Sequence, residues 1–190
     1  REQVAWSDHE RRAGGGDASI MPTLEKLIEV GPRVRVATGG PTDPEGRCVV
    51  YWMQRSQRGR DNAALDQAVR AANALGLPVL TVFGLTADYP GAQRRHYRFL
   101  VDALPEVQGQ LEERGVPLVV RLGSPDKVVL EVCREVRPAL VVGDENPVRV
   151  GRQWRENVRK GLGRPFVCVD SDVVVPTALF PREEYAARTI

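Results

Sequence analysis

The sequence predicts an α/β fold, a doubly wound five-stranded parallel sheet of the Rossmann-like type. Two features of the chain support this prediction. Short runs of consecutive apolar residues, which are typical of strands covered on both faces, recur along the chain. Amphipathic stretches with the helical period separate these runs, and the alternation indicates parallel strands joined by right-handed helical crossovers. The predicted strands are residues 48–53, 78–84, 117–122, 139–143 and 166–170.

Two helices are predicted between the first three strands. Residues 61–75 place apolar side chains on one face, with Asp61 able to cap the start and Gly76 able to end the helix. A longer helix is expected from about Arg94 and should stop before the third strand. Pro105 inside it predicts a kink or a break, because proline removes a backbone donor and clashes with the preceding turn.

Two more helices flank the fourth strand. Ser124 followed by Pro125 gives one of them an N-cap and a proline in its first turn. The other ends near Gly161 or Gly163 and buries one apolar stripe. The stripe consists of Val150, Trp154 and Val158.

The domain built from these elements is expected to span residues 47–176. Residues 1–46 are interpreted as an N-terminal arm, a short helix near Leu24 and a turn-rich connector. Within them, the alternation of valine and arginine at 34–36 predicts a short edge strand. The apolar segment 173–176 either extends the last strand of the domain or follows it.

The composition narrows the class of protein. The chain has 190 residues, with 27 Lys and Arg against 25 Asp and Glu, a formal charge of +2, and 42% hydrophobic residues. These values are ordinary for a globular protein and exclude a disordered tail or a histone-like polycation. No apolar run reaches the roughly 20 residues of a membrane span, so no membrane association is expected. The start has neither a signal-peptide pattern nor an initiator Met.

The residues that usually carry metal or nucleophilic chemistry form no recognisable site in the sequence. The chain contains no G-x-G-x-x-G after a strand, no Walker P-loop and no G-x-S-x-G. His9 and His96 have no Cys or His partner at ligand spacing and are predicted to be surface residues. Three cysteines in apolar contexts predict buried, reduced thiols in a cytoplasmic protein. They are Cys48, Cys133 and Cys168.

The loops after the first and fourth strands form the predicted ligand-binding edge. Open sheets of this kind bind ligands outside the carboxyl ends of their strands, where the strand order reverses. At the first loop an aromatic face, a polarizable sulfur, an amide and a guanidinium come together. They belong to Trp52, Met53, Gln54 and Arg55. In the alternative interpretation, the two large side chains are core residues and the arginines of the loop are solvated.

The loop after the fourth strand adds Asp144, Glu145 and Asn146 to the same edge. Adjacent carboxylates on a loop rarely converge on one atom, so acid–base catalysis is not predicted there. Three arginines of the following helix share one face and are suited to phosphates or to acidic residues of a partner domain. They are Arg152, Arg155 and Arg159. The alternative for this stripe is a solvated face.

Six blocks of the sequence carry a resemblance to a known family. They are VVYWMQRSQRGRDNAAL (49–65), LGLPVLTVFGLTADYPGAQRRHYRFL (75–100), RGVPLVVRLGSP (114–125), RVGRQWRENV (149–158), VDSDVVVP (169–176) and EEYAARTI (183–190). In this order the blocks resemble class II cyclobutane-pyrimidine-dimer photolyases. The resemblance covers roughly residues 33–190, and the order of the blocks makes it specific.

The resemblance implies a light-driven DNA repair lyase. In this family a reduced, light-excited FAD passes an electron to a pyrimidine dimer in UV-damaged DNA, and the cyclobutane ring splits. An N-terminal α/β domain supports a helical domain that holds FAD and the lesion, and in some members it binds an antenna chromophore such as a deazaflavin. The edge of such an antenna pocket is expected at Trp52, Met53, Gln54, Arg55, Asp144, Glu145 and Asn146.

The sequence departs from the family pattern at its end, because it stops at Ile190, before the helical domain. No FAD-binding or lesion-binding residue of the family can be assigned, and the chain alone is not expected to repair DNA. Residues 177–190 are expected to begin the linker to the helical FAD-binding domain, the main expected partner. Damaged DNA would be reached through the parent protein.

Two other functions remain open from the sequence. Residues 141–151 distantly resemble a strand followed by a phosphate loop, which would fit a stand-alone nucleotide-binding or universal-stress-like α/β module. Glycine is missing, however, where close approach of the backbone to phosphate would need it. In the other alternative, the chain is an interaction module that docks on another domain through its arginine stripe.

Overall fold

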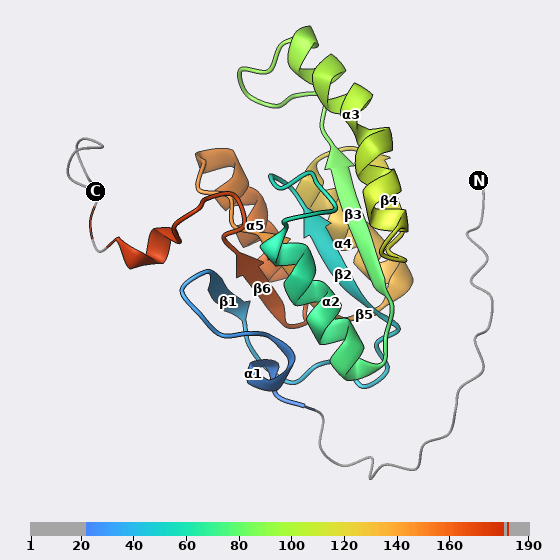
Figure 1. The fold of residues 1–190 in the computed structure, drawn as a ribbon, viewed down its shortest axis with the longest axis vertical. Helices are drawn as coiled ribbons and strands as arrows, with labels where there is room; N and C mark the ends of the chain where they lie inside the picture. Colours follow the sequence, from blue (N-terminus) through green and yellow to red (C-terminus); the bar gives the residue numbers. More distant parts are fainter. Residues whose placement is uncertain (1–21, 181, 183–190) are drawn as a thin grey trace.

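The computed structural model describes residues 22–180 and 182. In this part of the chain, one six-stranded sheet lies between two layers of helices (Figure 1). The strands are β1 Val34–Thr38, β2 Cys48–Met53, β3 Val79–Leu85, β4 Leu118–Leu122, β5 Pro138–Asp144 and β6 Phe166–Val169. The helices are α1 Leu24–Leu27, α2 Ala63–Leu75, α3 Arg94–Glu112, α4 Pro125–Val136, α5 Arg149–Gly161 and the 3₁₀ turn η1 Thr177–Leu179.

The predicted parallel sheet is confirmed, with one strand more than the five expected. The strand order is β1-β6-β5-β2-β3-β4, and every neighbouring pair is parallel except β1 and β6. β1 is the edge strand predicted at 34–36. It pairs antiparallel with β6 and so belongs to the sheet of the domain. The segment 173–176 forms no strand, and Val174 is 93% exposed.

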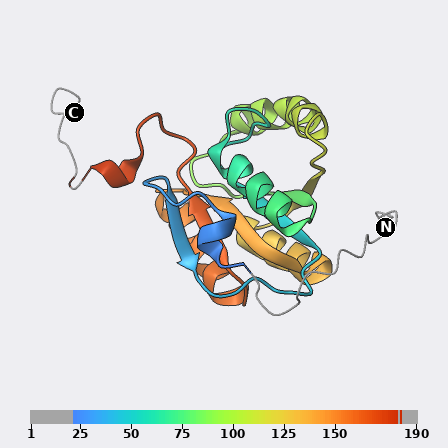
Figure 2. The same cartoon turned by 60° about the horizontal axis from the view of Figure 1, so that its bottom comes forward.

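Helices cover both faces of the sheet (Figure 2). Because side chains alternate along a strand, successive residues of β2 enter different cores. Tyr51 and Met53 pack with α1, α2 and α3 on one face. Val50 and Trp52 pack with α4 and α5 on the other face. All six residues of β2 and all seven of β5 are buried, as the continuous apolar runs predicted.

Two details of the helices differ from the prediction. Asn62, not Asp61, caps α2, and its side-chain oxygen accepts the backbone N–H of Leu65 at 3.0 Å. The predicted stop at Gly76 is confirmed by its φ of 64°. α3 runs without a break through Pro105, which is exposed. Burial of apolar side chains further along α3 outweighs the loss of one backbone hydrogen bond.

Within the described ranges, 22–180 and 182, no helix has the length and apolar character to cross a membrane. The same residues contain no cluster of three or more His, Cys, Asp or Glu side chains suited to a metal ion. All three cysteines are buried free thiols. The predicted arm at residues 1–20, with His9, lies outside the described residues.

The strand order reverses between β2 and β5. From β2 the chain moves to β3 and β4 on one side, then crosses to β5 on the other side of β2. The loops after β2 and β5 therefore leave the sheet side by side at its carboxyl edge, where open α/β sheets bind ligands. This confirms the predicted reversal and places both candidate loops at one location.

Candidate functional site

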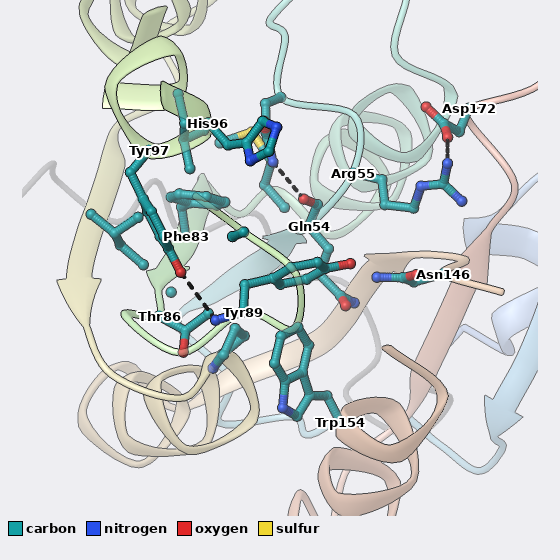
Figure 3. A pocket seen from close by; sticks show the side chains of 17 residues that line it. Gln54, Arg55, Phe83, Thr86, Tyr89, His96, Tyr97, Asn146, Trp154 and Asp172 are labelled. Atoms are coloured by element: carbon teal, nitrogen blue, oxygen red, sulfur yellow. Dashed lines mark hydrogen bonds and ion pairs between the residues drawn. The ribbon is translucent and has the colours of Figure 1, made fainter. Parts of the chain in front are cut away.

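A cavity of about 360 Å³ opens at this carboxyl edge, beside the ends of β2, β3 and β5 (Figure 3). This volume falls within the roughly 300–1,000 Å³ that is usual for small-molecule sites. Apolar side chains from four elements form much of its wall. They are Met53, Phe83, Leu85, Leu100 and Pro125.

Three further aromatic residues give the cavity a rigid side. Tyr89 lies in the loop after β3, Tyr97 in α3 and Trp154 in α5. The rings of Tyr89 and Trp154 have centroids 6.0 Å apart and are tilted by 59°. The Tyr97 hydroxyl accepts the backbone N–H of Tyr89 at 3.0 Å and donates to the carbonyl of Ala87 at 2.9 Å. These two hydrogen bonds fix the loop that carries Tyr89.

Asp144, at the end of β5, organises the loop after β2. It is 1% exposed, and one carboxylate oxygen accepts three successive backbone N–H groups, from Gln54 at 2.9 Å, Arg55 at 2.7 Å and Ser56 at 2.9 Å. A buried carboxylate is tolerated when hydrogen bonds replace its hydration. Its role is therefore to shape the loop that lines the cavity.

The second oxygen of Asp144 is also occupied. It accepts the hydroxyl of Tyr51 at 2.9 Å and that of Ser171 at 3.1 Å. Burial, together with the charge of Asp144, raises the pKa of Tyr51 well above its usual value, so this phenol remains a neutral donor. Asn62 donates to the Tyr51 hydroxyl at 2.9 Å and so ties the network to the start of α2.

Glu145 and Arg155 form an ion-paired support behind the cavity. The guanidinium of Arg155 contacts Glu145 at 2.5 Å, and Arg35 of β1 contacts the other Glu145 oxygen at 2.9 Å. Arg155 also donates to the backbone carbonyl of Asn146. It is only 7% exposed, and this burial lowers its pKa while the charge of Glu145 opposes the change. The edge strand β1 thus helps to hold Asn146.

Polar groups also form the rim of the cavity. Arg55 and Asp172 make an ion pair there (Figure 3). His96, at the start of α3, lines the cavity, and its Nδ1 accepts the backbone N–H of Gln93 at 2.9 Å. It is exposed, as the sequence predicted, and its imidazole closes the first turn of α3. Amide, guanidinium and imidazole groups thus face the same space as the aromatic rings.

The structure brings four of the seven predicted pocket-edge residues into the cavity wall. They are Met53, Gln54, Arg55 and Asn146. The other three do not line it. Trp52 is completely buried on the opposite face of the sheet, where its ring lies 6.1 Å from that of Phe166. Asp144 and Glu145 support the cavity from behind. Binding by the four lining residues stays a prediction.

The arginine stripe is not a continuous surface. Arg155 is directed inward to Glu145 and Asn146, so it is not a surface cation. Arg152 and Arg159 are exposed, and Arg159 pairs with Glu156 of its own helix at 2.7 Å. The described residues thus leave two of the three predicted cations on the surface of α5.

Sequence reasoning missed the lining residues that come from β3, the loop after it, α3 and α5. Phe83, Tyr89, Tyr97 and Trp154 supply most of the aromatic surface. One signal was available, because β3 neighbours β2 in any sheet of this kind and its carboxyl end lies at the same edge. The positions of Tyr97 and Trp154 depend on helix packing, which the sequence pattern does not specify.

Comparison with known proteins decides the family. The family model described as DNA photolyase matches residues 49–190. The chain belongs to the DNA photolyase family. It is 40% identical over 158 residues to the deoxyribodipyrimidine photo-lyase of Methanothermobacter thermautotrophicus, covering 83% of this chain and 35% of that protein. It is 36% identical over 149 residues to the photo-lyase of Potorous tridactylus, covering 77% of this chain and 28% of that protein.

Solved photolyase structures share the fold. The archaeal photolyase from Sulfolobus tokodaii, described with two FAD molecules, aligns with 72% of this chain and 32% of its own, with a TM-score of 0.59 and 22% identity. A class III photolyase from Agrobacterium tumefaciens aligns with 65% of this chain and 26% of its own, with a TM-score of 0.53. The chain spans about a third of the length of the photolyases it matches.

Proposed function

We propose that this chain is the N-terminal antenna and support domain of a class II photolyase, which repairs UV-induced cyclobutane pyrimidine dimers in DNA with light. We further propose that its cavity holds an antenna chromophore of the deazaflavin type. The names of the relatives support a photolyase, and the sequence blocks between residues 49 and 190 are the basis for proposing class II. The observation that carries the second is the aromatic-lined cavity at the strand-order reversal.

The chemistry of the cavity fits an antenna better than a reaction site. A bound antenna absorbs light and transfers its energy through space to a distant flavin. Such a role requires a fixed, largely apolar pocket for a planar ring, with a few polar groups to orient it. Tyr89 and Trp154 offer ring faces, while Gln54, Gln57 and Asn146 offer amides.

The loop after β5 favours this function over nucleotide binding. Its two flanking glycines are used for packing inside the protein. A Cβ at Gly143 would lie 3.1 Å from the ring of Phe166, and one at Gly151 would overlap the amide of Asn146. The loop between them carries two occupied carboxylates, Asp144 and Glu145. A phosphate would meet negative charge there instead of free backbone N–H groups.

Chromophore binding is tested by titration of the purified chain with 5-deazariboflavin, followed by isothermal calorimetry and by quenching of tryptophan fluorescence. We expect saturable binding and a higher melting temperature. ATP serves as the comparison ligand. An unchanged melting temperature with 5-deazariboflavin, together with clear binding of ATP, would overturn the antenna assignment and favour the nucleotide-binding module.

The repair reaction is proposed for a longer protein that also contains a helical FAD-binding domain, and we propose that domain as the main partner. Arg33 holds the start of the segment that follows β6, residues 170–180, because its guanidinium donates to the carbonyls of Asp170 and Val173 at 3.0 and 2.7 Å. The segment then presents apolar side chains outward, with Val174 93% and Leu179 57% exposed. A fixed and exposed apolar segment is a suitable surface for another domain to pack on.

The exposed arginines of α5 offer a second contact to the helical domain. Reversing their charge (Arg152→Glu with Arg159→Glu) should weaken association with that domain, measured by copurification of separately expressed parts. Unchanged association would remove this contact from the proposal. The buried, reduced cysteines fit the proposed cytoplasmic location.

A further inference from the structure

Asn146 is held in one orientation by groups on three sides. Its backbone carbonyl accepts from the buried guanidinium of Arg155. Its side-chain Oδ1 accepts the backbone N–H of Val148 at 3.4 Å. Its amide lies directly against the backbone of Gly151, where a Cβ would overlap it. The residue is 4% exposed, so few other positions are open to this side chain.

The fixed orientation directs a hydrogen-bond donor at the cavity. A backbone N–H can be accepted only by the amide oxygen, so the amide nitrogen must occupy the other position. That nitrogen, Nδ2, has no hydrogen-bond partner among residues 22–180 and 182. In Figure 3 it points toward the side chains of Gln54 and Tyr89, and Asn146 lines the cavity. An almost buried amide donor thus meets the space without a partner.

We infer that Asn146 is a specificity-determining residue, which selects planar ring ligands that carry a carbonyl oxygen at the ring edge. Tyr89 and Trp154 provide ring faces but accept any flat apolar ligand of suitable size. A ligand that covers the Asn146 donor but cannot accept from it, by contrast, loses affinity, because the donor is then left without water and without a partner. Asn146 therefore adds a selection that the ring faces do not provide. This inference depends on the proposed chromophore pocket.

The ion-paired support behind the cavity holds Asn146 in place. Arg35, Glu145 and Arg155 form a chain of contacts from the edge strand to the Asn146 carbonyl. None of these three residues lines the cavity. They act as positioning residues, because they fix the donor without contact to the ligand.

The test compares two tricyclic probes on the full chain, 5-deazariboflavin, which has ring carbonyls, and anthracene, which has no hydrogen-bond acceptor. In Asn146→Asp the shape and the Oδ1 acceptor are kept, but the donor is lost. We expect the Kd for 5-deazariboflavin to rise about tenfold or more, the effect of one hydrogen bond and one unfavourable charge contact. The Kd for anthracene should change less than twofold.

A second pair of variants checks the orientation of the amide. In Gly151→Ala the new Cβ should displace Asn146 and cause the same selective loss. Gly109→Ala is the matched control. A Cβ at this helical glycine would meet nothing within 4 Å, and Gly109, near the end of α3, does not line the cavity. Near-UV circular dichroism verifies that each variant is folded.

The outcomes separate the two proposals. If wild-type protein fails to bind 5-deazariboflavin, the chromophore proposal and this inference both fall. If wild-type protein binds it, but Asn146→Asp leaves the ratio of the two affinities unchanged, only the assignment of Asn146 is overturned. An equal loss of both probes also overturns it, because that result describes general disruption of the cavity.

Discussion

Removal of the Asp144 carboxylate should destabilise the protein more than any change at its surface. In Asp144→Ala, three backbone N–H groups of residues 54–56 and two buried hydroxyls lose their acceptor. Each hydrogen bond to a charged group contributes about 1.5–3 kcal/mol, and water or rearrangement of the loop recovers part of the loss. We expect the free energy of unfolding to fall by about 4 kcal/mol.

The measurement is urea unfolding followed by far-UV circular dichroism, with a thermal melt as a second readout. For a chain of this size, a loss of about 4 kcal/mol corresponds to a fall in Tm of about 8–16 °C. Asp144→Asn is the matched control. It keeps an oxygen for the three backbone N–H groups, and the hydroxyls of Tyr51 and Ser171 can rotate to accept from its amide. We expect it to cost about half as much.

Two results would refute this reasoning. A loss below about 1 kcal/mol in Asp144→Ala would show that the loop does not depend on these hydrogen bonds. Equal losses in Asp144→Ala and Asp144→Asn would show that the negative charge matters and the acceptor geometry does not. Either result would remove Asp144 as the organiser of the cavity wall.

Three further predictions follow from packing and burial. Gly46→Ala should destabilise the protein by about 2 kcal/mol, because its Cβ would lie 2.5 Å from the Ala139 backbone, whereas Gly31→Ala meets nothing within 4 Å and should leave urea unfolding unchanged. Arg155→Ala should lower Tm by several degrees, since it removes a buried guanidinium that pairs with Glu145 and donates to the Asn146 carbonyl, while Arg159→Ala should leave Tm unchanged. Burial raises the pKa of three cysteine thiols from 9.0 to about 12. The stability linked to these thiols is therefore full below pH 9 and is lost as the pH rises from 9 toward 12. Iodoacetamide at pH 8 should label them only after unfolding, and labelling of the native protein would contradict their burial. They are Cys48, Cys133 and Cys168.

Sequence patterns located the strands well because burial on both faces leaves a local signal. The predicted strand 48–53 matches β2 at both ends. The same periodicity also explains one error. Trp52 and Met53 are neighbours in a strand, so their side chains must enter opposite faces. Met53 lines the cavity, whereas Trp52 is directed into the core that packs with α4 and α5. The alternation was present in the sequence, although the prediction grouped both residues.

Other parts of the site had no local signal. The prediction placed Asp144 and Glu145 at the cavity edge because they come at the end of a strand. The position in the chain is correct, but it does not determine the direction of either carboxylate. Their directions depend on partners distant in sequence, the N–H groups of residues 54–56 for one and Arg35 for the other. Arg155 is directed inward for the same reason.

The sequence by itself determined the alternation of strands and helices, the parallel sheet and the edge at which a ligand would bind. These features follow from apolar periodicity and from chain connectivity, which are local. Only the tertiary structure decided which side chains meet at that edge. It brought Tyr89, Trp154 and Asn146 to one cavity and joined β1 to the sheet, because these contacts link segments far apart in the chain and depend on packing and on the need to pair each buried polar group.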